Sequence, residues 1–397
     1  MEMEREKSFI QHTAQTNQHP YLIDIERAEG LYIYDKSGKA YMDMISGVAV
    51  NNIGHNHPRV INALKTQIDK HSHVMVYGEF IQDAPLKFTE KLVSLLPKNL
   101  NCVYSVNSGT EAIEAALKLG KRVTGRTELV SFRGSYHGST HGAMSVSGNE
   151  AKKQAFRPLL PDIRFIQHNS TADLTQISTK TAAVIIETVQ GDAGVRIPTK
   201  DFLMELRKRC TEVGALLIFD EIQCGMGRTG KIFAFEHFGV VPDILVLGKA
   251  LGGGMPIGAL VSSHENLWEF THNPMLGHIT TFGGHPIISA AANAFLEVLT
   301  SEIDLSEVER LGALLESIVG SDPEIIEIRR IGMLFAFDMV SFERVEKVVK
   351  RCLEKGLISF WFLSHPYSFR LSPPLSISER EIQKAGKIIL EAISETR

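Results

Sequence analysis

The chain has 397 residues, 44% of them hydrophobic and 22% charged, which is typical of a globular protein with a large buried core. Its 42 Lys and Arg residues and 46 Asp and Glu residues leave a formal net charge of −4 at pH 7. The charges are interspersed, so we expect neither nucleic acid nor an anionic membrane as a partner. No apolar run approaches the roughly 18 residues that a membrane span requires.

The N-terminus and the cysteines indicate a cytoplasmic, reduced protein. The opening sequence, MEMEREKSF, is acidic and has no apolar stretch, unlike a secretory signal or a mitochondrial transit peptide. The cysteines show neither a C-x-x-C pair nor a spacing to histidine that is typical of a zinc site. They are Cys102, Cys210, Cys224 and Cys352. We therefore expect no disulfide framework and no bound metal.

The N-terminal part is predicted to begin with short strands. Residues 20–50 contain two β-rich runs joined by a turn at Ser37-Gly38. A helix is expected from Pro58 to Lys70, because apolar residues recur there on one helical face. These apolar residues are Val60, Ile61, Leu64 and Ile68.

The middle of the chain alternates short apolar runs with helical patterns. The runs are apolar throughout, which suits strands covered on both faces of a mostly parallel sheet. They lie at 102–106, 128–132, 182–187, 215–220 and 244–247. This alternation predicts a doubly wound α/β sheet with ligands bound at the carboxyl ends of its strands.

The C-terminal part is predicted to be α+β. Helices are expected near 304–319, 342–355 and 378–394, with a short strand at 333–339. A polar, glycine-rich passage at 271–286 precedes them, and we interpret it as a loop and a domain boundary.

Residues 107–111, Asn-Ser-Gly-Thr-Glu, follow the strand at 102–106 and open a helical pattern. A helix N-terminus presents free N–H groups and the positive end of the helix dipole, and this combination binds phosphate. The alternative is an ordinary helix cap made by Ser108 or Thr110, with Glu111 in the first turn.

Asp220 follows the apolar run ALLIF, so its carboxylate is expected at the buried edge of the sheet. A buried carboxylate is costly unless it meets a cation, a metal or several donors. A surface acid pair with Glu221 is the alternative. Magnesium binding beside a phosphate loop is disfavoured, because the chain has no G-x-x-x-x-G-K-[ST] motif.

Lys249 comes directly after the apolar run at 244–247 and precedes the glycines at 252–254. Partial burial lowers the pKa of a lysine and makes its amine a usable nucleophile. A lysine that extends to solvent beside a flexible loop is the alternative. The glycines do not fit the nicotinamide pattern G-x-G-x-x-G.

Three further segments carry functional side chains. Tyr136 and His137 follow the strand at 128–132, where an aromatic ring could stack on a planar ligand or pack in the core. The loop at 280–284, Thr-Thr-Phe-Gly-Gly, offers hydroxyl donors. Arg370 precedes a Pro-Pro break, which suits either carboxylate capture or a structural salt bridge.

Together these segments resemble the class III pyridoxal-phosphate aminotransferases of fold type I, nearest to the acetylornithine and ornithine branch. The resemblance extends from GVAVNNIGHNHP (47–58) to RLSPPL (370–375). Its most specific stretch is FDEIQCGMGRTGKIFAFEHFGVVPDILVLGKALGGGMPIGA (219–259). The resemblance implies a large cofactor-binding domain at 59–286 and a smaller α+β domain built from residues 1–58 and 287–397.

The resemblance also implies roles for the cofactor-binding residues. Lys249 would form the Schiff base with pyridoxal 5'-phosphate, and Asp220 would pair with the pyridine nitrogen of the ring. Tyr136, beside His137, would stack on the ring, and Gln223 would bind its hydroxyl. Phosphate would be bound by Ser108, Gly109 and Thr110, with Thr281 reaching the phosphate of the neighbouring subunit in a homodimer.

For substrates, the resemblance implies that Arg370 binds the α-carboxylate of glutamate or 2-oxoglutarate. Glu187 would pair with this arginine or release it as the substrates alternate. Val48 stands where ornithine enzymes typically have a tyrosine near the pocket. The implied reaction is ping-pong transfer of the ω-amino group of an acylornithine-like donor to 2-oxoglutarate, giving an aldehyde and glutamate.

The chain departs from the family pattern at several positions. Ser139 replaces an arginine that is typical of acylornithine enzymes, Thr188 replaces a proline, and Asp192 replaces a glutamate. The segment at 360–369 is unusually aromatic, which indicates either strand packing or an apolar pocket wall. An ω-amine transaminase for 4-aminobutyrate, lysine or β-alanine, a glutamate-semialdehyde-type aminomutase, and a non-catalytic cofactor-binding relative are the alternatives.

Overall fold

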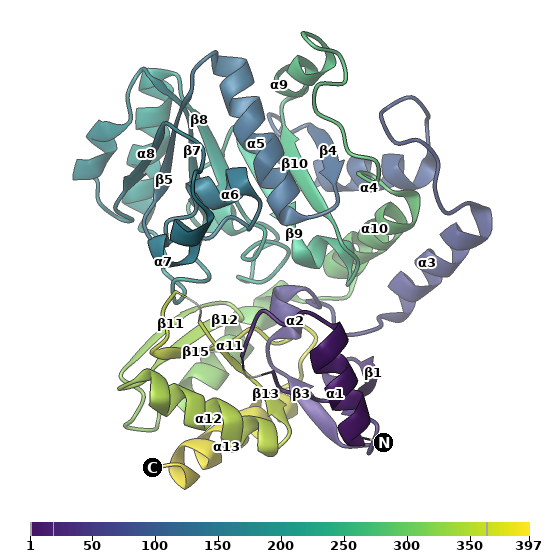
Figure 1. Cartoon of the computed structure of the whole chain (residues 1–397), viewed down its shortest axis with the longest axis vertical. Helices are drawn as coiled ribbons and strands as arrows, with labels where there is room; N and C mark the ends of the chain where they lie inside the picture. Colours follow the sequence, from purple (N-terminus) through teal and green to yellow (C-terminus); the bar gives the residue numbers. More distant parts are fainter. Residues whose placement is uncertain (1, 19, 363) are drawn as a thin grey trace.

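The computed structural model describes residues 2–18, 20–362 and 364–397. Figure 1 shows two lobes: one holds the largest sheet, and the other holds both ends of the chain. None of the helices formed by these residues has both the length and the apolar character needed to cross a bilayer.

The largest sheet has seven strands in the order β4-β10-β9-β8-β7-β5-β6. Strands β5 to β9 run parallel, whereas β10 is antiparallel to both of its neighbours. In sheet order the bounds are β4 Cys102–Val106, β10 Gly258–Ser262, β9 Ile244–Gly248, β8 Leu216–Asp220, β7 Thr181–Glu187, β5 Glu128–Phe132 and β6 Ile163–Ile166. The predicted, mostly parallel sheet is confirmed, with β6 and β10 added to the strands that the pattern indicated.

Helices cover both faces of this sheet, which is why its central strands β7, β8 and β9 are mostly apolar. Along β7, Val184 belongs to one hydrophobic cluster with α8, whereas Ile185 belongs to a second cluster with α5. The helices of this lobe and its flank are α3 Pro58–Lys70, α4 Asp83–Ser94, α5 Gly109–Thr124, α6 His141–Val146, α7 Glu150–Lys153, α8 Lys200–Val213, α9 His264–Trp268 and α10 Pro286–Ser301.

The second lobe contains two four-stranded sheets. One has the order β1-β2-β3-β13 and joins the two ends of the chain, because β3 pairs in parallel with β13. The other has the order β11-β12-β15-β14. The strands are β1 Ile25–Glu29, β2 Tyr32–Asp35, β3 Ala40–Asp43, β11 Glu327–Ile331, β12 Leu334–Asp338, β13 Leu357–Ile358, β14 Phe360–Trp361 and β15 Ser368–Leu371.

The last three of the remaining helices agree closely with those predicted for the C-terminal part, whereas the first two were not predicted. They are α1 Glu2–His12, α2 Ser46–Ala49, α11 Leu305–Val319, α12 Phe342–Glu354 and α13 Glu379–Glu395. Pairing of both chain ends in one sheet supports a small domain made from both, and the division at residues 58 and 286 stays a prediction.

Arg228 joins three parts of the chain. It is fully buried and donates hydrogen bonds to the carbonyls of Met333 and Pro373 and to the side-chain oxygen of Asn52. Burial lowers its pKa to about 9, although Asp43 opposes this shift. The N-terminal segment, the large sheet and the C-terminal part are therefore held together beside the carboxyl ends of the strands.

Candidate active site

A cavity of about 340 Å³ lies at the carboxyl ends of the parallel strands. Glu187 ends β7, Asp220 ends β8 beside it in register, and Lys249 follows β9 directly. This volume is within the range of small-molecule sites, about 300–1,000 Å³. The lining residues are Gly109, Thr110, Tyr136, His137, Gly138, Ser139, Glu187, Val189, Asp220, Ile222, Gln223, Cys224 and Lys249.

Lys249 is half-buried and begins a 3₁₀ turn, Lys249–Gly252. Its φ of +44° is in the left-handed region, which costs a residue with a side chain about 1–3 kcal/mol and is found most often at functional sites. Burial lowers the pKa of its amine, while the charges of Asp220 and Glu187 oppose that shift. The lowered pKa increases the share of neutral, nucleophilic amine.

Asp220 is 4% exposed and is held by two partners. Its Oδ2 lies 2.7 Å from Nδ1 of His137, and its Oδ1 accepts a hydrogen bond of 3.0 Å from the N–H of Ile222. The other ring nitrogen of His137 is buried and has no hydrogen-bond partner among the described residues. The carboxylate is therefore fixed in direction at the buried side of the cavity, as a charge-pairing role requires.

Two glycines make room for side chains in this cavity. A Cβ on Gly191 would overlap the amide of Gln223, and a Cβ on Gly138 would overlap Thr110. Gln223 and Thr110 both line the cavity, and they can occupy these positions because Gly191 and Gly138 have no side chain.

The N-terminus of α5 opens onto the same cavity. Ser108 caps the helix by accepting a hydrogen bond from the N–H of Glu111, while Gly109 and Thr110 line the cavity. The first N–H groups of a helix have no partner within it and attract anions. The sequence presents helix capping and anion binding as alternative roles for this segment. In the structure the two roles are compatible.

Glu187 accepts hydrogen bonds from the N–H groups of Tyr136 (2.9 Å) and Gly191 (3.0 Å). Burial raises its pKa to about 8, and the neighbouring Asp220 adds to the shift. Among the ion pairs of the described residues there is none between Glu187 and Arg370, because the carboxyl group of Glu187 is turned toward these two backbone donors.

We expect the Glu187→Gln variant to flatten the pH dependence of stability. Since the folded-state pKa of Glu187, about 8, lies above its ordinary value of 4.5, the folded protein retains a proton that the unfolded chain releases. The free energy of unfolding should therefore fall as the pH rises through this window, by at most about 1.4 kcal/mol per pH unit. Urea unfolding of both proteins at several pH values measures this difference, and parallel pH profiles would contradict it.

Four predicted residues lie outside the lining of this cavity, and one of them is Ser108, the cap of α5. Arg370, in β15, is buried near Lys249, on whose pKa its charge acts. Val48 is half-buried in α2 with a φ of +67°, which is rare for a β-branched residue. Thr281 is exposed in the loop before α10.

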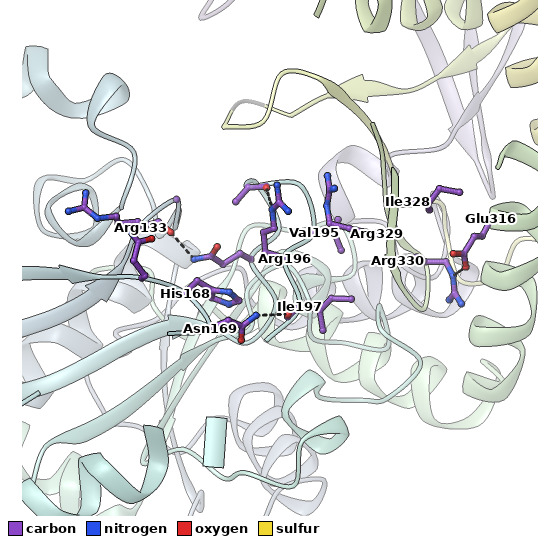
Figure 2. Close-up of a pocket in the computed structure, with 14 residues that line it drawn as sticks. Arg133, His168, Asn169, Val195, Arg196, Ile197, Glu316, Ile328, Arg329 and Arg330 are labelled. Atoms are coloured by element: carbon purple, nitrogen blue, oxygen red, sulfur yellow. Dashed lines mark hydrogen bonds and ion pairs between the residues drawn. The ribbon is translucent and has the colours of Figure 1, made fainter. Parts of the chain in front are cut away.

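A second cavity, of about 740 Å³, lies between the two lobes. Figure 2 shows Arg196, Arg329 and Arg330 among the residues that line it. Arg329 is paired with Asp338, and Arg330 with Glu316, so these guanidinium groups are neutralised within the protein. None of the side chains predicted for catalysis lines this cavity, so the smaller cavity is the candidate active site.

Comparisons with known proteins identify the family of the chain. Residues 13–393 match the family model described as Aminotransferase class-III. An acetylornithine aminotransferase of Methanopyrus kandleri is 38% identical over 369 residues, covering 92% of each chain. A LysW-aminoadipate semialdehyde/glutamate semialdehyde transaminase of Sulfurisphaera tokodaii is 33% identical and covers 94% of this chain and 95% of its own. The solved ornithine aminotransferase of Toxoplasma gondii has a TM-score of 0.92 at 29% identity, covering 100% of this chain and 95% of its own.

Proposed function

The chain belongs to the class III aminotransferases, and from that premise we propose that it transfers the ω-amino group of an acylornithine-like donor to 2-oxoglutarate. The products would be an aldehyde and glutamate, formed in two alternating half-reactions. The observation that carries this proposal is the convergence of Lys249, Asp220 and Glu187 in one cavity, with Arg370 buried close by.

The residues of the cavity fit pyridoxal 5'-phosphate as cofactor. Lys249 would hold its aldehyde carbon, Asp220 its ring nitrogen and Gln223 its ring hydroxyl. Gly109 and Thr110 would hold the phosphate at the N-terminus of α5, with Ser108 as the cap. Once bound, this cofactor supplies the group that carries the amine between substrates and a ring that withdraws electrons from the reacting carbon.

The protein's own side chains would perform the proton transfers. Nζ of Lys249 would take a proton from the substrate carbon and deliver it to the former aldehyde carbon of the cofactor. The lowered pKa of the amine suits this role. The charge of Asp220, fixed by His137, would stabilise a positive ring nitrogen in a buried setting where electrostatic interactions are strong. Tyr136 would cover one face of the ring and exclude water from it.

Substrate recognition would depend on Arg370. Its guanidinium is buried, and its Nε has no hydrogen-bond partner in the part of the chain that the structure describes, so a substrate carboxylate would supply the missing acceptor. Glu187 and Val48 are proposed as further substrate contacts on the strength of the family resemblance.

We propose a homodimer in which Thr281 reaches the phosphate of the partner site. Exposed apolar side chains on two segments near Thr281 support this arrangement, because such patches mark protein interfaces. They include Val74, Met75, Phe80, Ile81, Met275, Leu276, Ile279 and Phe282. Sedimentation should give twice the chain mass of 44.0 kDa, and a monomer would contradict the arrangement. A cytoplasmic location stays a prediction.

A donor without an acyl group is the second candidate. Ser139 stands at the rim of the cavity where acylornithine enzymes typically carry an arginine, and the ring of Phe360 contacts Arg370. The absence of an arginine at position 139 favours an ω-amine without an acyl group, such as 4-aminobutyrate, lysine or β-alanine. An aminomutase is disfavoured, because an enzyme that never binds 2-oxoglutarate has little need of Arg370.

A panel of amines tests these proposals. The purified enzyme is mixed with acetylornithine, succinylornithine, ornithine, lysine, 4-aminobutyrate or β-alanine, and the loss of the yellow cofactor absorbance is recorded. We expect acetylornithine or succinylornithine to react fastest, with glutamate formed only when 2-oxoglutarate is present. Turnover without any keto acid would indicate a mutase, and no reaction with any amine would indicate a non-catalytic relative.

A further inference from the structure

Arg370 is 7% exposed, and among the described residues it has no ion pair. Its guanidinium carbon lies 5.3 Å from the ring centre of Phe360 and 5.7 Å from that of Phe362. These contacts do not satisfy its donors, and Nε is buried without an acceptor from residues 2–18, 20–362 and 364–397. A buried guanidinium in this state has a strong tendency to pair with any carboxylate that can reach it.

Asp192 is a carboxylate whose charge acts on Arg370, since it opposes the lowering of the pKa of Arg370 by burial. Its Oδ2 nevertheless accepts hydrogen bonds from Nζ of Lys152 (2.8 Å) and from Oγ of Ser364 (2.7 Å). Asn149 supports this arrangement by donating to Oγ of Ser364 (3.0 Å). Asp192 is therefore directed to Lys152 and not to Arg370.

Lys152 also borders the active site. Its Nζ lies 5.5 Å from the ring centre of Tyr136, whose hydroxyl is 3.1 Å from Oγ of Ser139. Both Tyr136 and Ser139 line the 340 Å³ cavity. Ser364 lies between β14 and β15, so its hydrogen bond to Asp192 connects the two lobes beside the cavity.

We propose that Lys152 is a positioning residue that keeps Arg370 available for a substrate carboxylate. By holding Asp192, Lys152 removes the internal carboxylate that would otherwise compete with 2-oxoglutarate for Arg370. The enzyme then binds dicarboxylates such as 2-oxoglutarate and glutamate without first breaking an internal ion pair. The inference deepens the proposed function and rests on it for the identity of the acceptor.

Loss of Lys152 has a definite expected consequence. Asp192 would remain buried beside Glu187, on whose pKa its charge acts, and would have lost its ion pair with Lys152. Its carboxylate would then be able to turn toward Arg370, on which its charge already acts. Binding of the dicarboxylate should weaken, whereas binding of a donor amine that does not use Arg370 should change little.

The test compares the holoenzyme with its Lys152→Met, Lys152→Arg and Asp192→Asn variants and with the double variant Lys152→Met/Asp192→Asn. Calorimetry measures the binding of succinate, an unreactive dicarboxylate, and kinetics give separate KM values for 2-oxoglutarate and the donor. We expect Lys152→Met to weaken succinate binding and raise the KM for 2-oxoglutarate about tenfold, within the usual range of coupling between sites. Lys152→Arg should keep most of the affinity.

The double variant separates positioning from general stability. With Asp192 replaced, the competitor is absent, so succinate affinity should return to nearly the wild-type value even without Lys152. Equal weakening in the single and double variants, or no weakening in either, would overturn the proposal. Exposed Lys208→Met serves as the control. Succinate binding needs no turnover, so it tests Lys152 even if the proposed amine donor is wrong.

Discussion

Replacing Lys249 by alanine is expected to abolish transamination and to release the cofactor on gel filtration. Lys249 follows β9 and shares the cavity with Asp220 and Glu187, so its amine is the nucleophile within reach of a ligand there. It would supply both the covalent attachment and the proton transfer, and proton transfer alone contributes about 10²–10⁴-fold to a rate. We therefore expect turnover to fall at least about a thousandfold.

The measurement combines the rate of glutamate formation with the absorbance of bound cofactor after gel filtration. Lys208→Ala, on the exposed side of α8, is the matched control and should retain both activity and colour. Turnover of Lys249→Ala within tenfold of the wild type would show that another group performs the chemistry.

The second large effect is expected for Asp220→Asn. The amide keeps the size of the side chain and can still contact His137, but it has no negative charge to stabilise a positive ring nitrogen. Removing one such electrostatic contact typically costs about 10²–10³-fold in kcat. Because the charge acts in the transition state, the KM of the donor should change little.

Steady-state kinetics of Asp220→Asn with a saturating donor test this expectation. The surface variant Asp201→Asn, in the first turn of α8, controls for loss of a carboxylate elsewhere. A kcat within threefold of the wild type would mean that Asp220 serves only to hold His137 in place.

The sheet and the position of Asp220 and Lys249 at its edge could be predicted because both follow local rules. Apolar runs mark strands buried on two faces, and the carboxyl ends of parallel strands meet at one edge. Asp220 and Lys249 follow two such runs, so their proximity was accessible from the sequence. The antiparallel strand β10 could not be predicted from the sequence, because the direction in which two strands pair depends on contacts between distant segments.

Contacts between side chains that are far apart in the sequence also could not be predicted. His137 and Asp220 are 83 residues apart, and Lys152 and Asp192 are 40 residues apart. Nothing in the local pattern joins the members of either pair; only the folding of the loops around the sheet does so.

The resemblance implies that Glu187 pairs with Arg370 or releases it as the substrates alternate, and this role stays a prediction. The structure turns Glu187 toward two backbone N–H groups and leaves the charge of Asp192 acting on Arg370. Backbone donors at a bend cannot be read from residue types, so this detail required the fold.

The central claim is a covalent link between the cofactor and one lysine, and peptide mapping after borohydride reduction tests it directly. The protein is incubated with pyridoxal 5'-phosphate, reduced, digested and analysed by mass spectrometry. We predict that the cofactor is fixed on the peptide that contains Lys249 and on no other in stoichiometric amount. A colourless protein with an unmodified Lys249 peptide would contradict the account.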